Sequence, residues 1–239
     1  MLKDKCASAL QEKLIRFSSQ LSGPERDNLK LMLGLAAGNL ADQWQIPDRH
    51  SDRMEFDTLL VCLEQLQPHS KKVPRNGIVY KGKPKFLSET LLGELQNEAR
   101  IERLKAIDHN NHFLGCGGPT ANQLAVSKQL LDFVISKAGS VGATSIASYL
   151  FYERTGQGLV PHVDTEVFSL NALMMIEHTG RGASQSQLVI FSSGLNREEI
   201  DLQPGELLLF FADSVVHGRT PVSEGELVTI LTVGFQPEM

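Results

Sequence analysis

Residues 203–226 read QPGELLLFFADSVVHGRTPVSEGE, and this stretch decides the fold that we expect for the chain. It contains a Pro-Gly turn, the very apolar run ELLLFF and a short polar break, followed by the segment VVHGRTPV and a second glycine turn. Short apolar runs bounded by turn residues are typical of buried β-strands. His217 follows one expected strand and precedes another, so we expect it at a sheet edge or at the mouth of a barrel.

The same pattern extends over the whole C-terminal half of the chain. Short segments rich in β-branched and aromatic residues alternate with turn signals; they cover residues 144–153, 162–164, 168–177, 186–193, 199–203, 205–212, 215–222 and 226–235. This spacing predicts an all-β sandwich or jelly roll. Ahead of it we expect, in order, a strand at 77–82, a helix at 88–107, a glycine-rich turn at 114–122 and a helix at 121–138.

The N-terminal part has a helical character instead. Residues 5–66 show helical periodicity, and Ser22, Pro24 and Glu25 form a helix-start signal. Proline, glycine and positive charge then cluster in QPHSKKVPRNG. We therefore expect an α+β protein with an N-terminal helical segment, residues 1–70, and a β-rich domain with flanking helices, residues 71–239.

Composition limits the classes of function. The 239 residues include 23 basic and 28 acidic side chains, and the net charge of −5 argues against a nucleic-acid partner. The sequence shows neither an apolar run long enough for a membrane span nor a signal peptide. Cys6, Cys62 and Cys116 are widely spaced and form no C-x-x-C pair, which favours a reducing compartment. We expect a cytoplasmic protein with no membrane partner.

A candidate metal site begins in residues 161–178, PHVDTEVFSLNALMMIEH. On a strand, residues i and i+2 point to the same face, so His162 and Asp164 can converge while Val163 turns away. His217 is the third candidate, because the strands of a jelly roll can return the chain beside its own beginning. Two imidazoles and one carboxylate form the set that binds Fe(II) on one face and leaves the other positions open.

The ladder of strands from about residue 145 to 235 resembles the double-stranded β-helix of the Fe(II)/2-oxoglutarate-dependent oxygenases. The resemblance is closest to their prolyl-hydroxylase-like branch, and QPGELLLFFADSVVHGRTPVSEGE is its most specific element. It implies Fe(II) held by His162, Asp164 and His217, with 2-oxoglutarate as co-substrate and O2 as oxidant. It also implies hydroxylation of an unactivated C–H bond in a small-molecule or peptide substrate.

One position departs from the family pattern. Members of this branch usually carry, about ten residues beyond the distal histidine, an arginine that holds the far carboxylate of 2-oxoglutarate, and a hydroxyl residue two positions later. Here Leu227 replaces that arginine, and Thr229 holds the hydroxyl position. Arg219 lies at i+2 from His217, so on an extended strand it would face the same barrel interior, and it is our first substitute. Its alternative role is a salt bridge at the rim. Arg154 is the second substitute.

Two alternatives remain open at this point. The missing arginine is compatible with a metal-dependent binding or sensing module that has no turnover, or with a cupin-type metalloenzyme that does not use 2-oxoglutarate. The N-terminal helices match no family pattern, and their amphipathic character requires an apolar partner surface. We expect them to bind substrate or to form a homodimer.

Overall fold

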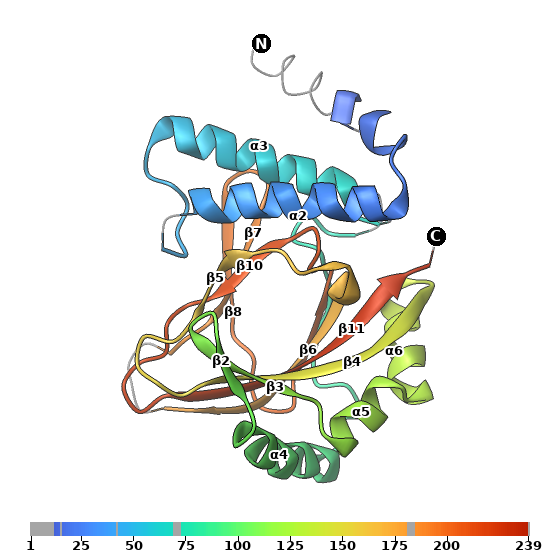
Figure 1. Ribbon diagram of the computed structural model, residues 1–239, viewed down its shortest axis with the longest axis vertical. Helices are drawn as coiled ribbons and strands as arrows, with labels where there is room; N and C mark the ends of the chain where they lie inside the picture. Colours follow the sequence, from blue (N-terminus) through green and yellow to red (C-terminus); the bar gives the residue numbers. More distant parts are fainter. Residues whose placement is uncertain (1–11, 15, 42, 69–72, 181–184, 239) are drawn as a thin grey trace.

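The computed structural model describes residues 12–14, 16–41, 43–68, 73–180 and 185–238, and its described strands form two antiparallel sheets. The larger sheet has the strands β1 (Ile78–Gly82), β9 (Leu207–Phe210), β6 (Leu170–Thr179), β11 (Leu227–Pro237), β4 (Val141–Tyr152), β3 (His112–Cys116) and β2 (Ile107–His109), in that spatial order. The smaller sheet has the order β5 (Leu159–His162), β10 (Val216–Arg219), β7 (Leu188–Ser192) and β8 (Asn196–Ile200). The two sheets face each other, as Figure 1 shows. The α+β jelly-roll prediction is confirmed.

At β6 the larger sheet is buried on both faces, which explains why this strand is apolar at almost every position from Leu170 to Ile176. Leu173 and Met175 belong to the core between the sheets, whereas Ala172 and Met174 belong to a second core on the outer face. Since successive strand residues point to opposite faces, burial on both sides requires an apolar residue at nearly every position.

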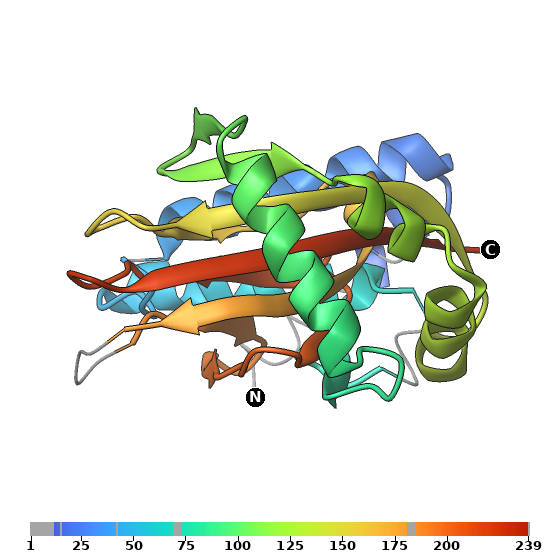
Figure 2. The ribbon, with the colours of Figure 1, turned by 90° about the horizontal axis from the view of Figure 1, so that it is seen from below.

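Three helices cover that outer face. They are α4 (Glu89–Arg103), α5 (Pro119–Ala125) and α6 (Lys128–Ala138). Figure 2 shows α4 crossing β4, β11 and β6. Ser88 caps α4, because its side chain accepts a hydrogen bond from the Leu91 N–H at 3.2 Å.

The region between α4 and β4 departs from the sequence prediction. The glycine-rich stretch expected as a turn contributes Leu114–Cys116 to strand β3, which forms a hairpin with β2. The single helix expected over 121–138 is two helices, because Ser127 caps a new helix by accepting from the Leu130 N–H at 3.2 Å. The apolar periodicity of the sequence continues through residues 126 and 127, whereas the hydrogen bond of the Ser127 side chain interrupts the helix there.

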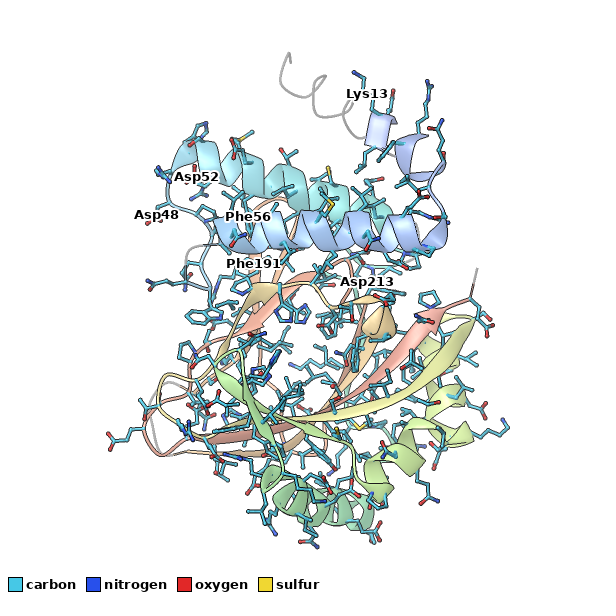
Figure 3. The ribbon with its side chains drawn as sticks, viewed as in Figure 1. Lys13, Asp48, Asp52, Phe56, Phe191 and Asp213 are labelled. Carbon is cyan, nitrogen blue, oxygen red and sulfur yellow. The ribbon has the colours of Figure 1, made fainter. Side chains whose placement is uncertain are left out.

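Two further helices, α2 (Gly23–Leu40) and α3 (His50–Leu66), cover the outer face of the smaller sheet. The predicted start signal of α2 is confirmed, since the Ser22 N–H donates to Glu25 Oε2 at 2.7 Å. Phe56 of α3 meets Phe191 of β7 edge-on at 5.5 Å between ring centroids (Figure 3). These helices therefore bury an apolar face on the sheet that carries two of the predicted metal ligands. None of the described helices has the length and hydropathy needed to cross a bilayer.

The boundary that we predicted at residue 70 lies in 69–72, outside the described residues. On either side of it, α3 ends at Leu66 and β1 begins at Ile78.

We expect Phe56→Ala to destabilise the fold strongly. The side chain is 0% exposed and packs among Leu60, Val189 and Val216, so its loss leaves a cavity that costs about 3–5 kcal/mol. Urea unfolding followed by circular dichroism measures this difference. Phe17→Ala is the matched control, since Phe17 is 51% exposed; equal losses in both variants would show that the helices do not pack on the smaller sheet as described.

Candidate metal centre

Two neighbouring strands of the smaller sheet bring the predicted histidines together. His162 ends β5 and lies opposite His217 of β10 in the antiparallel register. Their ring centroids are 4.4 Å apart. Asp164 follows β5, and its backbone N–H donates to the Ala212 carbonyl oxygen at 2.8 Å, which holds it beside the loop that leads into β10.

The three side chains converge on one point. Asp164 Oδ1 lies 3.4 Å from His162 Nε2 and 3.7 Å from His217 Nε2. One ligand atom from each residue lies within 4.8 Å of the others, a spacing that suits a single metal ion. The structure therefore assembles the set His162, Asp164 and His217 that the sequence predicts.

Backbone carbonyls fix the orientation of both imidazoles. His162 Nδ1 lies 2.8 Å from the Val160 carbonyl oxygen, and His217 Nδ1 lies 2.9 Å from that of Val215. An Nδ1–H that donates to a carbonyl leaves Nε2 as a free acceptor, which is the arrangement of a metal-binding histidine. Asn171 Nδ2 donates to Asp164 Oδ2 at 2.8 Å, so Oδ1 stays available.

The electrostatics of the cluster suit cation binding. Burial lowers the pKa of His217 to about 4, and the neighbouring His162 contributes. Burial also opposes ionisation of Asp164, but His217, His162 and Asn171 together keep the pKa of this carboxyl below its usual value. Burial acts against a charged His162 as well, yet the Asp164 carboxylate beside it raises the pKa of the imidazole, so a metal ion that binds at Nε2 takes the place of a proton there. The Asp164 carboxylate and the neutral His217 imidazole can therefore both coordinate a cation.

The triad lies in a cavity of about 1150 Å³ between the two sheets. Apolar side chains of both sheets line its interior, among them Leu173, Leu188 and Ile230. Much of its exposed lining comes from two distant parts of the chain, the end of α2 with the loop that follows it and the β2–β3 hairpin. The cavity is large enough for a drug-sized ligand beside the metal ligands.

Arg219 lies inside this cavity. It is 2% exposed, stands two residues beyond His217 on β10, and therefore points to the same face of the strand. Its Nη1 donates to the Ser186 carbonyl oxygen at 3.0 Å and to Ser186 Oγ at 3.1 Å. Its Nε has no partner among the described residues. Since an unpaired buried donor is costly, this guanidinium is suited to an anionic ligand.

The structure does not bring the other two predicted co-substrate residues to the cavity. Thr229 alternates with Val228 and Ile230, which face the core between the sheets, so it points to the opposite face of β11. The Arg154 side chain is 64% exposed, pairs with Asp108 at 3.3 Å and stacks on Phe113. Of the three predictions for the co-substrate carboxylate, only Arg219 is compatible with this geometry.

Three residues of the cavity escaped the sequence reasoning. Tyr152 is 1% exposed, lies with its ring 5.6 Å from the Arg219 guanidinium carbon, and stacks on His112 at 5.4 Å. Asn171 orients Asp164. Its signal was visible, because it is the only polar residue in the apolar run LNALMMI. Tyr152 and His112 had no comparable signal, since their proximity arises from the pairing of β3 with β4.

Comparison with solved structures identifies the architecture. The epimerase SnoN from nogalamycin biosynthesis, described as α-ketoglutarate-dependent, superposes with a TM-score of 0.57 at 16% identity, covering 74% of this chain and 84% of SnoN. A Pseudomonas putida prolyl-4-hydroxylase has a TM-score of 0.55 at 17% identity over 68% of this chain and 94% of its own. The chain has the fold of the 2-oxoglutarate-dependent iron oxygenases.

A third structure with this oxygenase fold was solved with small ligands bound. HygX from Streptomyces hygroscopicus, with nickel, 2-oxoglutarate and hygromycin B, has a TM-score of 0.55 at 12% identity and covers 69% of this chain and 84% of HygX. Comparisons with protein-family models and with curated proteins give no match. The predicted double-stranded β-helix is thus confirmed by comparison of structures, although the sequence identities to these proteins are only 12–17%.

Proposed function

We propose that the protein is an Fe(II)- and 2-oxoglutarate-dependent oxygenase that uses O2 to hydroxylate a C–H bond of a small-molecule or peptide substrate. The observation that carries the proposal is the convergence of His162, Asp164 and His217 in a cavity that also contains a buried, partly unpaired Arg219. The fold shared with SnoN and the prolyl-4-hydroxylase supports it.

The three metal ligands fit ferrous iron. Two imidazoles and one carboxylate bind Fe(II) on one face, and no fourth histidine, cysteine or acidic residue among the described residues joins this cluster. His178, the other histidine of the strand-rich half, instead pairs with Glu226 at 2.8 Å. The opposite positions therefore remain open to ligands from the cavity.

Arg219 fits the far carboxylate of the co-substrate. Two residues of extended strand span roughly 7 Å, so the guanidinium and the metal ligand His217 stand on one face at a separation that suits a short dicarboxylate. Arginine matches a carboxylate in a bidentate geometry. Burial lowers the pKa of the Arg219 guanidinium, whereas Tyr152 and Glu226 act in the opposite direction and favour its charged form.

The role of the protein is to hold and shield the reactants. When bound, Fe(II) and 2-oxoglutarate supply the oxidative chemistry with O2. The ligand triad fixes the metal, Arg219 orients the co-substrate, and apolar residues such as Leu173 and Ile230 keep water from the interior. The same fold serves the epimerase SnoN and the carbocyclase SnoK, so the fold does not determine the outcome of the reaction, and hydroxylation is our proposal.

We expect a visible absorption band when Fe(II) and 2-oxoglutarate are added together without oxygen, because the co-substrate chelates the metal and produces a charge-transfer transition. Anaerobic absorption spectroscopy measures it. Zn(II), which has a filled d shell, should give no band. Iron binding without a band would contradict the use of 2-oxoglutarate and would favour a cupin-type metalloenzyme or a metal-dependent binding module. Absence of iron binding would refute the whole proposal.

The location and the partners that we propose for the chain are based on its composition and on the packing of α2 and α3. We propose a cytoplasmic enzyme that acts on neither nucleic acid nor membrane, in line with its net charge of −5. The α2–α3 layer covers the smaller sheet, and we retain substrate binding and homodimer formation as its two proposed roles.

A further inference from the structure

One face of helix α2 lies directly on the elements that carry the metal ligands. Lys30, Gly34 and Gly38 follow one another at intervals of four residues, so they share that face. Lys30 reaches the loop before β10, Gly38 lies against β5, and Gly34 lies against Val163, the residue that follows β5. Figure 3 shows Asp213 of that loop beneath α2.

The two glycines allow the helix backbone to touch the ligand strand on either side of His162. A Cβ at Gly38 would lie 2.2 Å from the Pro161 carbonyl oxygen. A Cβ at Gly34 would lie 2.2 Å from Cγ2 of Val163, the residue between the two ligands of the His-x-Asp motif. Val163 is 5% exposed and packs in the same core as Ala37 of α2. The backbone between His162 and Asp164 is thus held from behind by α2.

The third contact of this face is a buried ion pair. Lys30 Nζ bonds Asp213 Oδ2, and the two side chains are only 9% and 4% exposed. Asp213 belongs to residues 211–215, which join β9 to β10. This loop orients two ligands, because the Ala212 carbonyl accepts from the Asp164 N–H and the Val215 carbonyl accepts from His217 Nδ1.

We infer that Lys30, Gly34 and Gly38 are positioning residues of the metal centre, so that α2 is a structural part of it. The inference rests on the proposed metal site and extends it to the N-terminal helices. Without the Lys30 cation, the buried Asp213 would keep only its hydrogen bonds with Ser169 and Ser214, and the loop that holds Asp164 and His217 would rearrange. A side chain at position 34 would push Val163 and displace the ligands on both sides of it.

Gly34→Ala tests the helix contact. We expect Ni(II) to bind the metal-free variant about tenfold more weakly than the wild type, within the range found for residues that support metal ligands. Isothermal titration calorimetry on the folded protein measures this affinity. Gly93→Ala is the matched control, because Gly93 also lies inside a helix, α4, and a Cβ there meets nothing within 4 Å. It should bind Ni(II) as the wild type does.

A compensating change separates positioning from general destabilisation. In Gly34→Ala/Val163→Ala the two methyl groups that cause the clash are gone, and we expect most of the lost Ni(II) affinity to return. Lys30→Met should also weaken Ni(II) binding about tenfold, and Lys30→Arg, which keeps the charge, should restore it. This pair of variants decides the question if Gly34→Ala does not fold.

The outcomes are distinct. A lower melting temperature with Ni(II) affinity within twofold of the wild type, in Gly34→Ala or in Lys30→Met, would overturn the positioning role and leave α2 as packing alone. A wild-type protein that binds no Ni(II) would overturn the proposed metal site itself, on which the inference rests.

Discussion

Asp164→Ala should abolish metal binding. The carboxylate is the single anionic ligand of the cluster, and its loss leaves two imidazoles with no fixed third donor. The loss of affinity should exceed the roughly 10- to 100-fold that follows from changes outside the ligand shell. Titration of the metal-free protein with Fe(II) under anaerobic conditions measures it, and product formation from 2-oxoglutarate should fall in parallel. His162→Ala and His217→Ala should behave in the same way.

The fold should survive these substitutions, since the three side chains surround the cavity and make little of the packing between the sheets. Circular dichroism verifies this. Asp132→Ala serves as the control, because Asp132 is exposed on α6 and, within the described part of the chain, pairs with Lys128 of the same helix. Full activity in any one of the three triad variants would show that the triad is not the metal site.

Arg219→Ala should weaken 2-oxoglutarate binding severely while Fe(II) still binds. The substitution removes the charged partner that we propose for a buried carboxylate. This costs about 2–5 kcal/mol, a factor of roughly 30 to several thousand in affinity. The concentration of 2-oxoglutarate that half-saturates the anaerobic absorption band measures the effect. Arg219→Lys should recover part of the affinity, because the charge remains while the bidentate geometry is lost.

Arg154→Ala is the informative comparison. Its guanidinium lies outside the cavity, 3.3 Å from Asp108, so we expect co-substrate affinity close to that of the wild type. A large loss in Arg154→Ala alone would mean that Arg154 reaches the cavity when the co-substrate binds. Unchanged affinity in both variants would mean that this cavity holds no dicarboxylate through an arginine.

The sequence predicted the strands and the pair His162 and Asp164 because both depend on local rules. Each strand of the C-terminal half lies within two or three residues of its expected position, as turn residues and apolar runs mark both ends. His162 and Asp164 were paired by strand alternation. His217 required one additional assumption, that the strands of a jelly roll return the chain to its beginning, and the register of β10 with β5 satisfies it.

The features that the sequence did not reveal depend on contacts between distant segments. β2 is three residues long and exposed at every position, so it carries no alternation that could be recognised. Its turn residues Asn110 and Asn111 have φ values of 45° and 64°, a conformation that asparagine tolerates. The pair of asparagines was therefore the available sequence signal for this hairpin turn. Thr229 was assigned from a family spacing, whereas its true direction is set by which face of β11 meets the other sheet.

The predicted metal ligands and much of the exposed cavity lining come from different parts of the chain. The predicted metal ligands and Arg219 all lie between residues 162 and 219, whereas much of the exposed lining comes from the end of α2 and from the β2–β3 hairpin, which precede that segment in the sequence. Substitutions at Leu35 or Asn39 on one side of the mouth, or at Asn110 on the other, can alter what enters without touching a ligand. Under the proposed function, such a division would let a lineage, or an engineer, exchange substrates by diversifying two short surface segments while the metal centre is inherited unchanged.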